Sequence, residues 1–431
     1  MRPNIIYLHS HDTGRYVQPY GYDVPTPNIQ RLADEGILFR QAFCAAPTCS
    51  PSRAALLTGQ SAHSSGMTGL VNRGFGLADY SQHMLHTLRG AGYYSCLAGL
   101  QHLAKDPTVL GFDEIRKPEN NHVQNVAPTA IEFLNKPAQQ PFFLDIGFFE
   151  NHRKFPEPGP LDDPRHCRPP APLPDTPETR YDMAAYRTMA RDLDEGIGAI
   201  LYALDATGLA DNTLIINTTD HGVAFPGCKC NLTDHGMGVM LIMRGPGGFT
   251  GGKICDAMVS HIDIFPTLCD LLEIDEPAWL QGTSMLPLIN DEAAEINDAV
   301  FAEVSYHAAY EPQRAVRTQR YKYIRRYVEH DGPILPNCDD SPSKDVWLQH
   351  GWQERSIAPE QLYDVVFDPN ETSNLIADSA HQSVLKDLRA RLDQWMEETD
   401  DPLLQGPVIP PGGAQVTLAS ESSPNGAIEV V

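Results

Sequence analysis

The chain has 431 residues, of which 42% are hydrophobic, 20% charged and 8% aromatic, and these are ordinary values for a globular protein. Its 32 Lys and Arg against 56 Asp and Glu give a net charge of -24, which excludes the broad basic face that binding to nucleic acid requires. A small anionic substrate is still allowed, because a few cationic groups and a metal ion can reverse the potential inside one pocket.

The first residues of the chain and the pattern of its cysteines favour the cytoplasm as the cellular compartment. The first four residues lead directly into the apolar run 5–8, which is too short for the apolar region of a signal peptide. A run of about 18 apolar residues, as a membrane-spanning helix needs, is absent from the sequence. The nine cysteines are odd in number and scattered, which favours reduced thiols over a disulfide framework. The sequence therefore predicts a cytoplasmic protein without a membrane partner.

Short apolar runs alternate with helical segments along the first two thirds of the chain. Four runs predict strands, at residues 4–9, 93–97, 141–149 and 212–217. Apolar residues at helical spacing predict helices over 28–35 and 181–204. The strand runs are apolar almost throughout, which is typical of strands covered on both faces. The pattern therefore predicts an α/β fold with a large, mostly parallel mixed sheet flanked by helices.

The chain is too long for one ordinary core, so we expect a second domain. Nine prolines within residues 155–177 predict an ordered surface loop or lid. After about residue 298, a small antiparallel sheet and a closing helix are predicted by the runs 299–304, 314–318, 321–327 and 380–398. The predicted units are a catalytic domain, a smaller domain and a Gly-, Pro- and Ser-rich tail that is poorly ordered or docked, over 1–298, 299–404 and 405–431.

The most informative segment begins at Cys49 and reads Cys-Ser-Pro-Ser-Arg-Ala-Ala-Leu-Leu-Thr-Gly. It predicts a turn that leads into a helix, because Pro51 suits a first helical position and Ser50 or Ser52 can cap. Free N–H groups at a helix start form an anion site, and Arg53 follows closely. A nucleophile at Cys49 would therefore face an anion, although an isolated cysteine at such a position is usually a buried packing residue.

Two pairs of potential metal ligands each follow a predicted strand. His11-Asp12 follows the first strand, and Asp220-His221 follows the strand that ends at residue 217. Open α/β sheets place their sites at the carboxyl ends of strands, so the two pairs can meet across one crevice. Taken singly, each histidine is also typical of a hydrogen-bonded loop residue. A nucleophile that attacks an anionic group needs a cation nearby, which favours the metal interpretation.

The pattern C-x-P-S-R-x-x-L-L-T-G resembles the signature of the sulfatase family and is present in full. The resemblance implies an alkaline-phosphatase-like fold and hydrolysis of a sulfate ester or sulfamate. In that family the cysteine is oxidised to formylglycine, whose hydrate supplies the nucleophile, and the arginine steadies the modified residue and the metal site. By resemblance, Cys49 and Arg53 take these roles, and a formylglycine-generating enzyme is the implied maturation partner.

The resemblance also assigns the metal ligands. Family members carry an acidic pair after the first strand and Asp-Asn or Asp-His after the later one, so Asp12, Asp220 and His221 match. His11 stands where the family usually has Asp. Calcium, the common ion of the family, prefers oxygen ligands, whereas two imidazoles with two carboxylates suit manganese or zinc. The expected cofactor is a divalent metal whose identity these residues leave open.

Three further residues match family positions one by one. Lys229 falls where related enzymes hold Lys or Arg against the sulfate. His102 resembles the histidine of the family's Gly-Lys-x-His segment, which assists the nucleophile, although Leu100 replaces the lysine. His152 resembles the histidine that contacts sulfate and protonates the leaving atom. Each of these residues could instead be an ordinary loop residue.

Scattered matches from about residue 4 to 376 resemble the heparan N-sulfatase branch of N-sulfoglucosamine sulfohydrolases most closely. They include His63-x-x-Gly66-Met67, the pair His152-Arg153, and Leu362-Tyr363-Asp364. The leading substrate class is therefore a sulfated amino sugar or another sulfated saccharide. Candidate substrate-contacting residues, each equally typical of ordinary polar surface, are His63, Asp234, His235, Glu303, His307 and Arg314.

Two other functions stay open at this point. A phosphonate monoester or phosphodiester hydrolase of the same superfamily would use the same kind of metal-supported nucleophile, and His11 and Leu100 favour it slightly. A non-catalytic protein that binds sulfated sugars is the third interpretation. A decayed enzyme should lose Cys49 or Arg53 first, and both are present.

Overall fold

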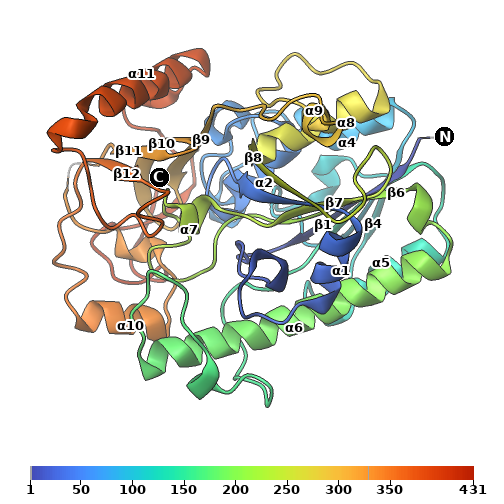
Figure 1. Cartoon of the computed structure of the whole chain (residues 1–431), viewed down its shortest axis with the longest axis horizontal. Coiled ribbons are helices and arrows are strands. Elements are labelled where there is room, and N and C mark those ends of the chain that lie inside the picture. Colours follow the sequence, from blue (N-terminus) through green and yellow to red (C-terminus); the bar gives the residue numbers. More distant parts are fainter. Residues whose placement is uncertain (1, 329) are drawn as a thin grey trace.

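The computed structural model describes residues 2–328 and 330–431. Its larger sheet has eight strands in the order β4-β3-β5-β1-β6-β7-β2-β8 (Figure 1). Their bounds are β1 Asn4–Ser10, β2 Ile37–Phe43, β3 Tyr94–Gly99, β4 Glu114–Arg116, β5 Phe142–Gly147, β6 Thr213–Thr219, β7 Leu241–Arg244 and β8 Lys253–Ser260. Neighbouring strands are parallel except at β7, which runs antiparallel to β6 and β2. The predicted mostly parallel mixed sheet is confirmed.

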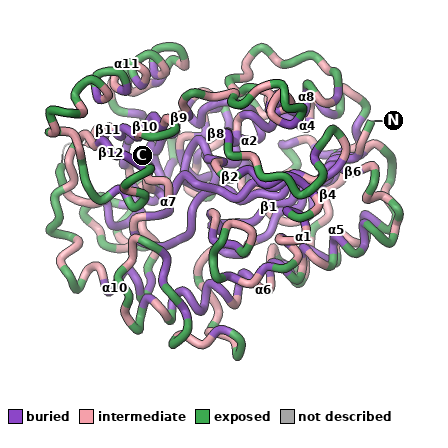
Figure 2. The backbone as a smooth tube through the Cα atoms, in the orientation of Figure 1, coloured by how far each residue is buried: buried purple, intermediate pink, exposed green. Residues whose placement is uncertain are grey.

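Helices cover both faces of this sheet, and its central strands are buried (Figures 1 and 2). One face carries α1 Pro27–Glu35, α5 Val123–Asn135 and α6 Pro177–Ala206; the other carries α2 Cys49–Thr58, α4 Met84–Gly90 and α8 Ile264–Leu272. Short helices are α3 Ala62–Ser65, α7 Asp234–Met237 and α9 Leu286–Ile289. The long helix α6 begins where the proline-rich loop ends, because Thr176 and Thr179 form a capping box around Pro177.

A second, antiparallel sheet has the strand order β12-β11-β10-β9. Its elements are β9 Ala299–Tyr306, β10 Tyr310–Thr318, β11 Tyr321–Arg326 and β12 Glu360–Asp364, with α10 Pro342–Gln349 before β12 and α11 Gln382–Glu398 after it. Leu385, Leu388 and Leu392 of α11 pack on one face of this sheet. The other face contacts Phe43 and Met258 of the larger sheet. The predicted small sheet and closing helix are confirmed, while the division at residue 298 stays a prediction.

The C-terminal tail is docked, which selects one of the two alternatives predicted for it. Its strands β13 Gln415–Thr417 and β14 Ile428–Val430 form an antiparallel pair. Thr417 N donates to Ala308 O at 2.8 Å, beside the turn that follows β9. Arg73 Nη2 donates to Pro424 O at 2.9 Å, and Ser423 Oγ donates to Asp340 Oδ2 at 2.5 Å.

Truncation after Gly412 should lower the thermal unfolding midpoint by several degrees, because Arg73 loses its three acceptors in the tail and the buried Ala414 is removed. The hydrogen bonds and apolar contact together should contribute about 1–3 kcal/mol. Differential scanning calorimetry of both chains measures this change. Ile409→Ala, at an exposed position, is the control and should leave the midpoint in place; an unchanged midpoint after truncation would mean that the docked tail adds no stability.

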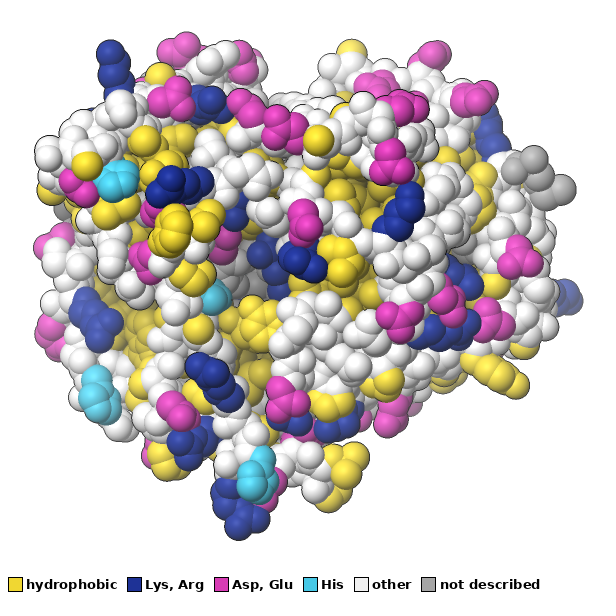
Figure 3. All heavy atoms as spheres, in the orientation of Figure 1, with side chains coloured by type: hydrophobic (Ala, Val, Ile, Leu, Met, Phe, Trp, Pro, Cys, Tyr) yellow, Lys and Arg dark blue, Asp and Glu magenta, His cyan; other side chains and the backbone are white. Residues whose placement is uncertain are grey.

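Two properties of the structure concern the composition of its helices and the charges on one face of its surface. Among the described residues, none of the helices combines the length and the apolar composition that crossing a bilayer needs. On the face shown in Figure 3, acidic and basic side chains are interspersed, and the described residues form no continuous basic area there. This arrangement agrees with the acidic composition.

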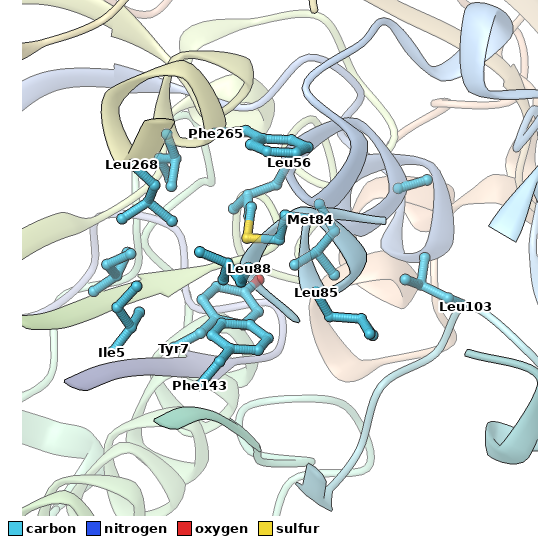
Figure 4. Packing of buried hydrophobic residues seen from close by; sticks show 14 of the residues in the cluster. Ile5, Tyr7, Leu56, Met84, Leu85, Leu88, Leu103, Phe143, Phe265 and Leu268 are labelled. Carbon is cyan, nitrogen blue, oxygen red and sulfur yellow. The ribbon is translucent and has the colours of Figure 1, made fainter. Parts of the chain in front are cut away.

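The apolar layer above the sheet fixes the helix that begins at Cys49. On this side one cluster joins the sheet to its helices (Figure 4), with Ile5, Tyr7 and Phe143 from the sheet, Leu56 from α2, Leu88 from α4, and Phe265 and Leu268 from α8. Ile6 and Leu8, which alternate with Ile5 and Tyr7 along β1, belong to the core on the opposite face. Each fully buried side chain of this size contributes roughly 1.5–3 kcal/mol. The start of α2 is therefore held rigidly against the sheet.

Candidate active site

Three chain segments converge at the carboxyl-terminal edge of the large sheet. β1 and β6 are parallel neighbours, so His11-Asp12 and Asp220-His221 leave the sheet at the same edge. Ligand atoms of His11, Asp12 and Asp220 and the thiol of Cys49 all lie within 4.8 Å of one another. His221 Nε2 lies 3.4 Å from Cys49 Sγ and 3.3 Å from Asp12 Oδ1. The structure thus brings together the nucleophile position and both predicted ligand pairs.

The helix start differs in detail from its prediction. α2 begins at Cys49, after an extended Thr48, and ends at Gly59 in the left-handed region that glycine favours. The two serines predicted as caps are engaged elsewhere: Ser50 Oγ accepts from Val71 N at 3.1 Å, and Ser52 Oγ donates to Asp220 O at 2.5 Å. The second contact ties α2 directly to the end of β6.

The donor set can hold a divalent ion. His11 Nδ1 lies 2.9 Å from Asp12 Oδ1 and 3.0 Å from Asp220 Oδ2, and these separations resemble the roughly 3.3 Å spacing of ligands around an ion with bonds of about 2.0–2.1 Å. His221 Nδ1 donates to Gly222 O at 2.9 Å, which leaves the lone pair of Nε2 directed at the cluster. Metal-binding histidines characteristically have such a hydrogen bond on their second nitrogen.

The electrostatics of the cluster favour the protonation states of metal ligands. Burial lowers the pKa of His11 to about 4, so its imidazole is neutral near pH 7. Burial alone would raise the pKa of Asp12, but the charge of Lys229 and those of the neighbouring histidines together outweigh burial and hold the pKa well below its ordinary value. The pKa of Asp220 is lowered in the same way, against its own burial, by His11, His221 and Arg53. Both carboxylates are therefore charged, and the neutral imidazole of His11 can offer a lone pair.

Arg53 is held by groups that sequence reasoning missed. Its Nη2 donates to Asp220 Oδ2 and to Ser10 O, each at 3.0 Å, and its Nη1 donates to His9 Nδ1. His9 must then carry its proton on Nε2, which donates to Asp145 Oδ1 at 2.8 Å. A histidine and an aspartate inside apolar strands were the signal in the sequence that could have revealed this support.

Lys229 lies between two carboxylates. Its Nζ is 2.9 Å from Asp12 Oδ2 and 3.0 Å from Asp339 Oδ2. Burial alone would lower the pKa of Lys229, but these two carboxylates outweigh it and raise the pKa well above its ordinary value. The pKa of the buried Cys49 thiol is also raised, chiefly by burial, so an unmodified thiol at this position stays protonated and is a poor nucleophile. Asp339 comes from a loop without a motif or apolar pattern that would single it out in the sequence.

Three more histidines lie at this site. The ring centroid of His11 is 5.7 Å from that of His102 and 4.7 Å from that of His152. Burial, followed by the charge of Lys229, lowers the pKa of His307 to about 3. Among the described residues, no group hydrogen-bonds to Nδ1 of His102 or of His307. Both nitrogens are therefore available to a bound molecule.

Three predicted substrate-contacting residues are instead enclosed in an ion-pair network. His63 Nδ1 lies 2.8 Å from Glu303 Oε1, Arg314 Nη2 lies 3.4 Å from Glu303 Oε2, and Arg314 Nε lies 2.5 Å from Asp401 Oδ2. The side chains are at most 2% exposed, so they present almost no surface to a ligand. The prediction for His63, Glu303 and Arg314 is corrected: their side chains contact one another and Asp401 beneath α11.

Two further predicted contacts, Asp234 and His235, also lie away from Cys49 in the hydrogen-bond network. Asp234 Oδ1 is 2.6 Å from Lys322 Nζ, on the small sheet. His235 Nδ1 is 3.1 Å from the hydroxyl of Tyr16, and its Nε2 is 3.1 Å from Asn370 Oδ1. These contacts join α7 to its neighbours, so the structure indicates a structural role for both residues. Of the six candidates, His307 alone faces the Lys229 region through its charge interactions.

Glu303→Gln should destabilise the fold by about 1–3 kcal/mol at pH 7, because His63 Nδ1 loses its buried carboxylate partner and Arg314 keeps only Asp401. Burial alone would raise the pKa of Glu303, but His63 and then Arg314 outweigh it and lower the pKa from 4.5 to about 2. A depressed carboxyl pKa adds stability above pH 4.5 that is lost as the pH falls toward 2. Urea unfolding at several pH values should therefore show that the free energies of unfolding of the wild type and the variant become similar in acid. A difference in free energy that does not change with pH would contradict this. Glu429→Gln, at an exposed position, is the control.

Comparisons with known proteins agree with this geometry. The Sulfatase family model matches residues 3–274, and the model named N-sulphoglucosamine sulphohydrolase, C-terminal, matches residues 228–350. Human N-sulphoglucosamine sulphohydrolase is 30% identical, with 89% of this chain and 88% of that protein covered. An ulvan-active sulfatase from Formosa agariphila is 26% identical over 93% of this chain and 76% of its own. A putative sulfatase structure from Bacteroides fragilis superposes with a TM-score of 0.76 at 22% identity, covering 95% and 98% of the two chains. The chain therefore belongs to the sulfatase family of sulfuric ester hydrolases.

Proposed function

We propose that this chain hydrolyses the sulfamate or sulfate ester of a small sulfated saccharide. The single observation that carries the proposal is the convergence of Cys49 with the ligand atoms of His11, Asp12 and Asp220 within 4.8 Å. The similarity to human N-sulphoglucosamine sulphohydrolase supports a sulfated amino sugar as the substrate. The compact cluster suits the transfer of one tetrahedral anion.

The proposed nucleophile is formylglycine made from Cys49 by a formylglycine-generating enzyme. Its hydrate supplies one hydroxyl that attacks sulfur and a second that, once deprotonated, expels sulfate as the aldehyde re-forms. Arg53 holds Asp220 beside this residue, and its own charge is steadied by His9 and Asp145. These contacts keep the start of α2 and the end of β6 in one geometry.

The proposed cofactor is a divalent metal held by His11, Asp12, Asp220 and His221. When bound, it supplies a Lewis acid that lowers the pKa of the hydrate and neutralises the transferred group. Because His11 offers nitrogen where the family usually has a carboxylate, we propose manganese or zinc in preference to calcium.

The other residues bind the transferred group and move protons. Lys229 uses two of its three N–H groups on Asp12 and Asp339, and the third can bind a sulfo oxygen. We assign protonation of the leaving atom to His152 and proton exchange with the hydrate to His102, whose Nδ1 has no hydrogen-bond partner among the described residues. His307 offers a further free nitrogen to the saccharide.

Mass spectrometry of the peptide that contains residue 49 tests the nucleophile. Protein produced together with a formylglycine-generating enzyme should show a loss of about 18 Da relative to cysteine. The same protein should then turn over a sulfamate or a sulfate ester faster than a phosphodiester. A modified protein that prefers the phosphodiester would support the alternative hydrolase, and one that cleaves none of the three would support a binding protein.

A further inference from the structure

Three charged side chains form a row from the buried metal site toward solvent. Asp12 is 0% exposed, Lys229 is 3% exposed and Asp339 is 15% exposed, and Lys229 Nζ bridges the two carboxylates at 2.9 and 3.0 Å. In the proposed function the sulfo group lies at Cys49, and the saccharide must extend outward. The leaving atom therefore lies on the outer side of the transferred group. Asp339 is the most exposed of the three charged side chains, and its carboxyl interacts with the charges of His307 and His152.

The loop that carries Asp339 is fixed on both sides. Asn337 Oδ1 accepts from Ala309 N at 2.8 Å, just after β9. Lys344 Nζ donates to Cys338 O at 2.6 Å, so α10 holds the loop from the other side. The carboxylate of Asp339 is therefore preorganised and does not depend on a mobile segment.

One oxygen of Asp339 is free for a ligand. Its Oδ2 accepts from Lys229, whereas no donor among residues 2–328 and 330–431 contacts its Oδ1. Burial and the charge of Asp12 would raise the pKa of this carboxyl, but Lys229, His307 and His152 together outweigh them and lower the pKa to about 2. Asp339 is thus a carboxylate at neutral pH, and a carboxylate can only accept hydrogen bonds.

An acceptor at this place distinguishes the two kinds of leaving atom. The bridging nitrogen of a sulfamate carries an N–H that can donate to a carboxylate, whereas the bridging oxygen of a sulfate ester has only lone pairs and is repelled. After cleavage the amine takes up a proton and becomes an ammonium, which a carboxylate stabilises; the alcohol from an ester stays neutral. Asp339 therefore favours a leaving nitrogen over a leaving oxygen, both in the bound substrate and in the product after cleavage.

We propose that Asp339 is a specificity-determining residue, which accepts a hydrogen bond from the leaving nitrogen and makes this site prefer S–N over S–O substrates. This inference rests on the proposed function. In the step concerned, a hydroxyl of the hydrate at residue 49 gives its proton to His102, and its oxygen forms a bond to sulfur while the S–N bond breaks. The nitrogen keeps the bonding pair, takes a proton from His152 and departs beside Asp339.

The test uses two sugars that differ in one atom, N-sulfo-D-glucosamine and D-glucose 2-sulfate. The modified wild type should cleave the sulfamate with the higher kcat/KM. Asp339→Asn should lower the sulfamate-to-ester ratio by about tenfold to a hundredfold, as expected for a lost hydrogen bond to a charged group. It should also weaken inhibition by the product D-glucosamine but not by D-glucose. Asp340→Asn, one residue along and paired with Lys344, is the matched control and should keep the wild-type ratio.

Each outcome of this test supports or overturns the role of Asp339. An unchanged ratio in a folded, formylglycine-containing Asp339→Asn protein, with both substrates slowed equally, would mean that Asp339 only positions Lys229. A wild type that prefers the ester would also overturn the inference while leaving it a sulfatase. If the modified wild type cleaves neither sugar, the proposed saccharide function fails, and the inference fails with it.

Discussion

Cys49→Ala is expected to abolish turnover, with a loss of at least about 10⁴-fold, because removal of a covalent nucleophile leaves only binding and electrostatic contributions. The thiol itself should be no better than alanine. It is buried and its raised pKa, caused chiefly by burial, keeps it protonated. Unmodified wild-type protein should therefore be as inactive as the variant, and activity should scale with the fraction of residue 49 that is formylglycine.

The matched control for this prediction is Cys44→Ala. Cys44 is also fully buried and close in sequence, but its Sγ contacts Gly236 O at 4.0 Å and it offers no atom to the ligand cluster. Steady-state rates and thermal midpoints of both variants, together with the mass of the residue-49 peptide, complete the experiment. Retained activity in a folded Cys49→Ala protein would contradict the assignment of the nucleophile.

Most of the site could be predicted because it follows the topology of a parallel sheet. The ends of β1 and β6 are apolar strands followed at once by polar pairs, and parallel neighbours necessarily deliver such pairs to one edge. The Cys49 segment could be placed beside them because its motif is complete. Helix and strand periodicity likewise identified α6, β1, β5 and β6.

Elements without a clear pattern of apolar residues could not be predicted from the sequence. β7 is only four residues long, and the first half of β8 is exposed or half-buried, so neither shows a clear apolar run. Asp339 comes from an irregular loop between β11 and α10, and its contact with Lys229 spans 110 positions in sequence. Local patterns carry no information about such a contact.

The wrong assignments at His63, Glu303 and Arg314 have one physical cause. Polar residues in otherwise apolar segments look alike in sequence whether they face a ligand or one another. Here Asp401, from the end of the small domain, supplies the counter-charge that completes the buried network. These ion pairs could not be predicted from local sequence patterns, because the four partners are far apart in the chain.

His11→Asp is expected to shift metal preference from manganese or zinc toward calcium, by about 100-fold or more in the ratio of affinities, comparable with other changes in the ligand environment of a metal. His11 Nδ1 faces Asp12 and Asp220 at 2.9 and 3.0 Å, so its replacement converts a mixed nitrogen and oxygen set into one dominated by carboxylates. Calcium favours oxygen ligands and a flexible shell, whereas zinc and manganese accept imidazole readily.

Metal content by mass spectrometry and the rise in thermal midpoint with each added ion measure this preference without reference to activity. His166→Asp, which makes the same change at an exposed position, is the matched control and should leave the order of ions unaltered. Calcium bound by the wild type more tightly than zinc and manganese, with the same order in His11→Asp, would show that His11 is not a ligand. The ion would then be held by Asp12, Asp220 and His221, and His11 would act through its hydrogen bonds to the two carboxylates.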